Sequence, residues 1–94
     1  MLNRIVKMSF KSENTETFQS LFLLVNEQIR TFPGCLGVKL LRDIENPNIF
    51  FTYSIWVNQN ALNAYRKSAF FDDTWRKTKV LFDNKPQAWS LLEQ

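Results

Sequence analysis

The sequence contains no histidine, a single cysteine and only two glycines. The missing histidine excludes catalytic triads and cysteine–histidine pairs that need an imidazole base, and it removes the commonest metal ligand. One cysteine, Cys35, can form neither an internal disulfide nor a thiolate zinc site. The two glycines, Gly34 and Gly37, match neither a phosphate loop nor a dinucleotide fingerprint. We therefore expect no metal and no bound cofactor.

Long apolar runs and concentrated charge are also absent. No stretch approaches the roughly 20 apolar residues that a membrane-spanning helix needs, and residues 1–4 do not begin a signal peptide. The net charge is only +3. The densest basic stretch, residues 66–79, contains Asp72 and Asp73 four residues before two of its cations, a spacing that stabilises a solvated helix face. We expect a cytoplasmic protein with neither nucleic-acid nor membrane partners.

Aromatic residues are abundant, with nine Phe, three Trp and two Tyr. Each aromatic side chain buries a large apolar area, so a short chain can fill a core or line a cavity with few of them. A length of 94 residues and a hydrophobic fraction of 45% are typical of one folded domain. We therefore treat residues 1–94 as a single domain.

Four segments have the alternation or the β-branched and aromatic composition of strands. They are residues 2–10, 35–43, 49–57 and 87–92. A turn sequence at residues 45–48 joins the second segment to the third, which predicts an antiparallel hairpin.

Two helical regions separate the strands. The first follows helix-start residues at 12–16 and ends at Pro33 and Gly34, because proline disfavours helical angles before it and glycine accepts a left-handed turn. The second region occupies about 58–67, breaks at 68–71 and resumes over about 72–82. The order strand, helix, strand, strand, helical region, strand predicts an α+β, ferredoxin-like β-α-β-β-α-β fold, with helices on one face of a four-stranded antiparallel sheet.

The third predicted strand has two apolar faces. One side carries Ile49, Phe51, Tyr53, Ile55 and Val57, and the other carries Phe50, Thr52, Ser54 and Trp56. Because the helices of this fold cover only one face, the other face needs a different cover. We expect a homodimer through the sheet face, since closed two-fold dimers are the commonest oligomers. The alternative is that loops cover these side chains or that they stay partly exposed.

Two sequence markers resemble the antibiotic biosynthesis monooxygenase domain, a family of dimeric α/β barrels. The first is Phe-Pro-Gly-Cys at residues 32–35, and the second is Trp56 followed by Ala-Leu-Asn-Ala-Tyr at 61–65 and Ser-Ala-Phe-Phe at 68–71. The resemblance extends from about Asn3 to Leu92. It implies that two sheets pack face to face and that each subunit keeps a pocket between its helices and its sheet.

Members of that family include cofactor-free oxygenases of aromatic polyketides, quinol monooxygenases and haem-degrading enzymes. The haem-degrading members have a histidine four residues after a phenylalanine; counted from Phe71, that position is Trp75. They also carry a functional asparagine on the first strand, where this chain has Lys7 or Met8. These departures argue against haem degradation.

The candidate pocket is a set of aromatic and small polar side chains around the third strand and the second helical region. These are Ser54, Trp56, Asn63, Tyr65, Phe71 and Trp75. In a cofactor-free oxygenase, Tyr65 would hydrogen-bond a phenolic oxygen and Trp56 would form a pocket wall. The alternative is that both rings belong to the core, which is the commoner role of a Trp or Tyr at strand or helix spacing. A cofactor-free oxygenase needs little more than an aromatic pocket with a few polar groups, because an electron-rich substrate itself reacts with oxygen in a site that excludes water.

The function we expect is cofactor-independent monooxygenation of a small aromatic, quinol-type substrate. No general base can be named, because the aspartates of the chain have turn or helix-start explanations. The alternative is therefore a dimer that binds a small aromatic or apolar ligand without turning it over.

Overall fold

Four strands form a single antiparallel sheet in the computed structural model, which describes residues 1–94. They are Leu2–Ser9 (β1), Cys35–Arg42 (β2), Ile49–Trp56 (β3) and Gln87–Leu92 (β4). The order across the sheet is β2-β3-β1-β4, so β1 and β3 lie in the centre. All four predicted strands are confirmed, each to within one residue at its ends.

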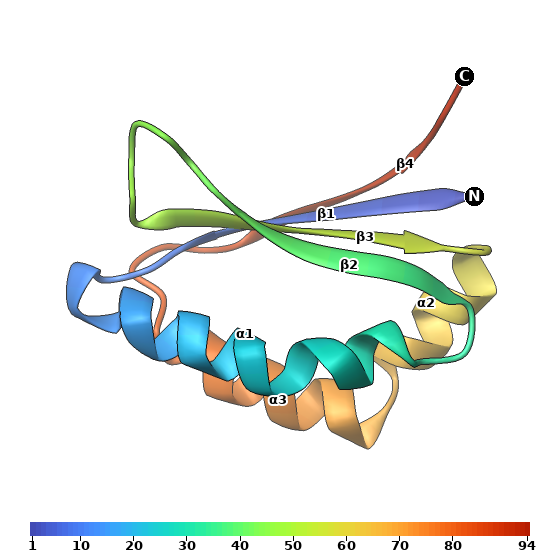
Figure 1. Cartoon of the computed structure of the whole chain (residues 1–94), viewed down its shortest axis with the longest axis horizontal. Coiled ribbons are helices and arrows are strands. Elements are labelled where there is room, and N and C mark those ends of the chain that lie inside the picture. The colour runs from blue at the N-terminus through green and yellow to red at the C-terminus, as the bar shows by residue number, and fades with distance from the viewer.

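Three α-helices cover one face of this sheet (Figure 1). Helix α1, Thr15–Arg30, follows a short 3-10 turn at Ser12–Asn14, and the return crossover contains α2, Gln59–Arg66, and α3, Ala69–Lys79. The element order is thus β-α-β-β-α-α-β, and the predicted ferredoxin-like α+β fold is confirmed. None of these helices has the length and apolar character that crossing a membrane requires.

Helix α3 begins at Ala69 rather than at residue 72, and it ends at Lys79 rather than at residue 82. The predicted break between the two helical stretches is present but shorter than residues 68–71, since only Lys67 and Ser68 separate α2 from α3. Ser68 caps α3: its hydroxyl oxygen accepts a hydrogen bond from the backbone N–H of Phe71 at 3.0 Å. At the other end, Phe82 leaves the helix and forms an isolated antiparallel bridge with Phe10.

The turn between α1 and β2 requires glycine at one position. Gly34 has φ +83°, and a Cβ placed on it would lie 2.5 Å from the Cβ of Ala61 in α2. The carbonyl of Gly34 also accepts a hydrogen bond from the backbone N–H of Val57 at 2.9 Å. The predicted left-handed turn is confirmed, and it lets α2 pack close to the end of α1.

Two clusters of buried side chains lie between the helices and the sheet. The first, which we call the Trp56 cluster, contains Leu2, Ile29, Val38, Trp56, Leu62 and Tyr65. The second, the Phe10 cluster, contains Met8, Phe10, Phe18 and Phe50. Because Trp56 and Phe50 belong to these clusters, the even-numbered residues of β3 face the helices.

The opposite side of the sheet, which we call the open face, has no helix over it (Figure 1). It carries the odd-numbered residues of β3, including Tyr53, whose hydroxyl donates a hydrogen bond to Asn3 Oδ1 at 2.8 Å. Neighbouring strands add Leu41, Trp89 and Leu91, which are 44%, 42% and 47% exposed. The open face is therefore rich in large apolar side chains.

Candidate functional site

A cavity of about 260 Å³ lies between the helical layer and the sheet, lined by residues of both core clusters. Its solvent-exposed lining residues are Arg66, Gln87 and Ala88. The cavity therefore opens between the C-terminal end of α2 and the edge strand β4. A cavity of about 150 Å³ already binds benzene, so this one has room for one aromatic ring or two fused rings.

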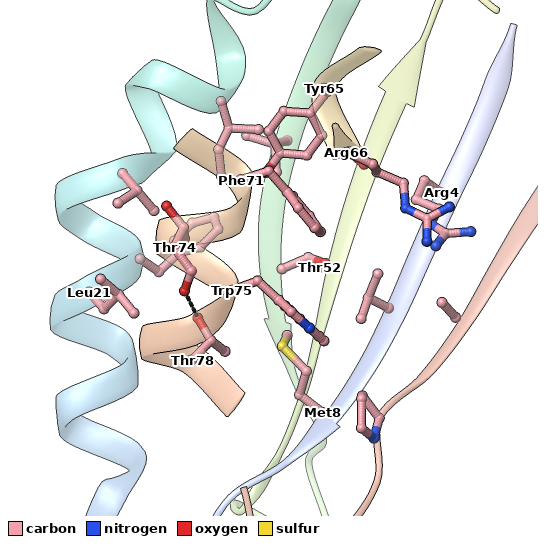
Figure 2. A pocket seen from close by; sticks show the side chains of 18 of the residues that line it. Arg4, Met8, Leu21, Thr52, Tyr65, Arg66, Phe71, Thr74, Trp75 and Thr78 are labelled. Carbon is pink, nitrogen blue, oxygen red and sulfur yellow. Dashed lines mark hydrogen bonds between the residues drawn. The ribbon is translucent and has the colours of Figure 1, made fainter. Parts of the chain in front are cut away.

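Three aromatic side chains form a continuous wall on the helical side of the cavity, which we call the aromatic wall (Figure 2). The ring of Tyr65 in α2 meets the ring of Phe71 in α3 edge-on, with centroids 5.1 Å apart. Phe71 and Trp75 stack at 6.0 Å with an angle of 10° between their planes. Their separation of four residues puts both on one face of α3.

Tyr65 combines an apolar body with one polar group. Its side chain is only 9% exposed and stacks on Trp56, with ring centroids 5.0 Å apart. Burial raises the pKa of the Tyr65 phenol well above its ordinary value, and the negative charge of the neighbouring Cys35 thiolate raises it further. The phenol therefore stays protonated at neutral pH and can donate a hydrogen bond to an oxygen atom of a ligand.

Small hydroxyl-bearing side chains interrupt the apolar lining. Ser54 of β3 lies on the sheet side, and its Oγ accepts a hydrogen bond from the indole Nε1 of Trp56 at 2.9 Å. The hydroxyl hydrogen of Ser54 is not used in that bond. Thr78 of α3 donates to the backbone carbonyl of Thr74 at 2.8 Å. Ser54 is thus a candidate polar contact for a bound molecule.

The structure brings together four of the six side chains that the sequence suggested. Ser54, Tyr65, Phe71 and Trp75 line the cavity. Trp56 is fully buried behind Tyr65, so it supports the aromatic wall instead of forming the cavity surface. Asn63 lies outside the lining, where its Oδ1 accepts a hydrogen bond from Gln59 Nε2 at 2.9 Å.

Two arginines at the mouth of the cavity were not among the predicted site residues. Arg4 of β1 and Arg66 of α2 both line the cavity, and their side chains lie close together at one edge of it (Figure 2). Strand alternation contains a signal for one of them, since Arg4, Val6 and Met8 are two residues apart and so share one face of a strand. A charged residue on an inward strand face is a candidate site residue.

The remaining charged and thiol groups lie outside this arrangement. Arg76 pairs with Asp72, and Lys77 with Asp73, on the exposed side of α3, which confirms the predicted four-residue pairs. Cys35 is half-buried, and burial raises the pKa of its thiol. No group of three or more cysteine, aspartate or glutamate side chains is arranged to hold a metal ion.

Comparisons with known proteins agree with this fold. The profile of the antibiotic biosynthesis monooxygenase family matches residues 1–77. Similar solved structures include a crystal structure of an antibiotic biosynthesis monooxygenase, 20% identical with a TM-score of 0.93 over 100% of this chain and 99% of that chain.

Two further structures share the fold. A conserved protein from Methanosarcina mazei Go1 is 20% identical with a TM-score of 0.93, over 100% of this chain and 94% of its own. A protein from Pseudomonas aeruginosa is 19% identical with a TM-score of 0.86, over 99% of this chain and 93% of its own. The search among curated proteins gave no match. On the family profile, the chain belongs to the antibiotic biosynthesis monooxygenase family.

Proposed function

We propose that this protein is a cofactor-independent monooxygenase that acts on a small aromatic, quinol-type substrate in the pocket between its helices and its sheet. The observation that carries the proposal is the cavity of about 260 Å³ with the aromatic wall on one side. Such a cavity suits a flat aromatic ring that stacks on aromatic side chains and is fixed by a few polar groups. Family membership supports the reaction class.

A quinol can supply every electron that the reaction needs. One oxygen atom of O₂ becomes bonded to a ring carbon, the other leaves as water, and the quinol becomes a hydroxyquinone. The chain then has three tasks: to stack the ring against Phe71 and Trp75, to donate a hydrogen bond from Tyr65 to a substrate oxygen, and to exclude water. The reaction therefore needs no separate reductant.

One feature of the lining favours the second candidate function, a dimer that binds a small apolar ligand without turning it over. The lining contains no aspartate, glutamate or histidine that could act as a base. In the enzymatic proposal, the quinol therefore loses its proton to solvent through the mouth of the cavity. The rate of oxygen uptake should then rise with pH towards the pKa of the quinol itself.

We also infer that two copies of the chain pair through their open faces. The apolar side chains there, among them Phe51, Ile55 and Trp89, would leave water on pairing. Sedimentation of the wild-type protein should give twice the mass of one chain, and Ile55→Glu should give a monomer. A monomeric wild-type protein at micromolar concentration would contradict this part of the proposal.

Oxygen uptake by purified protein with a panel of simple quinols tests the enzymatic function. We expect uptake above the spontaneous rate and a loss of about tenfold or more in Tyr65→Phe, which removes one hydrogen-bond donor from the pocket. Tyr53→Phe is the matched control, since it removes a phenol from the open face. Binding of quinols without uptake would favour the non-catalytic alternative, and absence of both would refute the pocket proposal.

A further inference from the structure

Arg4 and Arg66 come from distant parts of the sequence and converge on one edge of the cavity. Arg4 stands on the central strand β1 with its side chain on the helix-covered face, and Arg66 is the last residue of α2. Figure 2 shows both side chains reaching towards the same part of the mouth. The site therefore has a concentrated positive charge beside an apolar interior.

This charge has no acidic partner in the pocket. The lining contains no carboxylate, and the two ion pairs of the chain lie on the exposed side of α3. Arg4 donates a hydrogen bond from Nη1 to the neutral hydroxyl oxygen of Ser90 at 2.9 Å. Burial lowers the pKa of the Arg4 guanidinium, and the positive charge of Arg66 lowers it further. An anion placed between the two guanidinium groups would favour their charged forms and so oppose both causes of the lowered pKa.

We propose that Arg4 and Arg66 form an anion-binding mouth, and that the ligand of this pocket is an aromatic carboxylate. Its ring lies in the cavity against Phe71 and Trp75, and its carboxylate lies at the two guanidinium groups. A guanidinium presents a planar fork of N–H donors that matches the two oxygens of a carboxylate. The inference rests on the proposed function in one respect, since it names the substrate class of the same pocket.

The test compares two probes of nearly the same shape, the anionic 2-naphthoate and the neutral 2-naphthamide. Both fit the size estimated for the cavity. The three tryptophan indole N–H groups serve as NMR reporters, because Trp75 lines the cavity, Trp56 lies behind Tyr65 and Trp89 stands on the open face. We expect the Trp75 signal to shift on titration with naphthoate while the Trp89 signal stays in place.

Naphthoate should bind at least about tenfold more tightly than naphthamide, as expected for charge-assisted hydrogen bonds. Arg66→Gln should remove most of that preference without unfolding the protein, because Arg66 is exposed at a helix end. Arg4→Lys keeps the charge but loses the planar fork, so it should weaken naphthoate binding less than Arg66→Gln does. Lys67→Gln, which removes a neighbouring exposed charge outside the lining, is the control.

Three outcomes decide the proposal. A preference for naphthoate that Arg66→Gln abolishes and Lys67→Gln preserves would establish it. Equal binding of the two probes, or a preference that survives Arg66→Gln, would overturn the anion-binding mouth and leave the aromatic pocket intact. Absence of any Trp75 shift with either probe would overturn both this inference and the pocket on which the proposed function rests.

Discussion

The Phe10 cluster and the aromatic wall are both built from aromatic rings, but they use them in opposite ways. In the cluster, Phe10, Phe18 and Phe50 form a closed triangle with ring centroids 4.3, 5.5 and 5.7 Å apart. Each of these side chains is at most 3% exposed. The aromatic wall is instead a line, in which Phe71 meets Tyr65 on one side and Trp75 on the other. One side of that line of rings faces the cavity.

The elements that supply the rings explain this difference. The three rings of the triangle come from the residue that follows β1, from α1 and from β3, so they meet from different directions and fill the space between them. The rings of the aromatic wall come from consecutive helices on the same side of the sheet. Phe82 joins the two regions through contacts with Phe10 and Trp75. A closed arrangement contributes stability, and an open line leaves a binding surface.

Truncating one ring in each region should give the largest contrast. Phe50→Ala is expected to lower the free energy of unfolding by about 3–5 kcal/mol, because it leaves a cavity in the closed triangle. Phe71→Ala should cost only about 1–2 kcal/mol, because this half-buried ring already borders a cavity. Urea unfolding measures both values. Equal losses would mean that the aromatic wall is packed as tightly as the cluster.

Trp56→Phe tests the support behind the aromatic wall. The substitution removes the indole N–H that donates to Ser54 and leaves that buried hydroxyl without its partner. The expected loss is about 1–3 kcal/mol in the free energy of unfolding. The double variant Trp56→Phe, Ser54→Ala should lose less than the sum of the two single variants, and strict additivity would argue against coupling through this hydrogen bond.

Val6→Phe should fill the cavity from the sheet side, since Val6 is a lining residue on β1. The added volume enters existing space, so the free energy of unfolding should change by less than about 1.5 kcal/mol. Ligand binding and oxygen uptake should both disappear. A variant that stays folded, as shown by circular dichroism, and still binds quinols would place the ligand elsewhere.

The ionisation of Tyr65 gives the smallest effect, a change in alkaline stability. Because its folded pKa is raised above the unfolded value of about 10, its contribution to stability is fully present below pH 10 and is lost as the pH rises towards the folded pKa. The urea midpoint of the wild-type protein should therefore fall above pH 10, and that fall should be shallower in Tyr65→Phe. Tyr53→Phe provides the comparison, and identical slopes in both variants would contradict a specific role for Tyr65.

Much of this architecture could be predicted from the sequence, because strand alternation and the turn at Gly34 are local signals. The start of α3 was placed three residues too late because hydrophobic spacing alone does not show that Ser68 caps the helix. The cap is a hydrogen bond between its hydroxyl oxygen and the backbone N–H of Phe71. For the site, residue spacing and the family resemblance were enough to predict Tyr65, Phe71 and Trp75 as pocket residues. The position of Trp56 was not, because its stacking behind Tyr65 is a tertiary contact between a strand and a helix.

The closeness of Arg4 and Arg66 could not be predicted from the sequence for the same reason. Nothing local connects a residue of the first strand with the last residue of α2 until the fold brings them to one mouth. The inward position of Arg4 was nevertheless visible in the alternation of its strand. Charged residues at inward strand positions therefore merit the same attention as aromatic ones.

The most direct test of the proposed function is a turnover of quinol under oxygen-18 gas, with the product analysed by mass spectrometry. We predict that the wild-type protein places one labelled oxygen atom in the quinone product and one in water, and that Val6→Phe abolishes the labelled product. Unlabelled quinone with release of peroxide, or unchanged labelling in Val6→Phe, would contradict a monooxygenase reaction in this pocket.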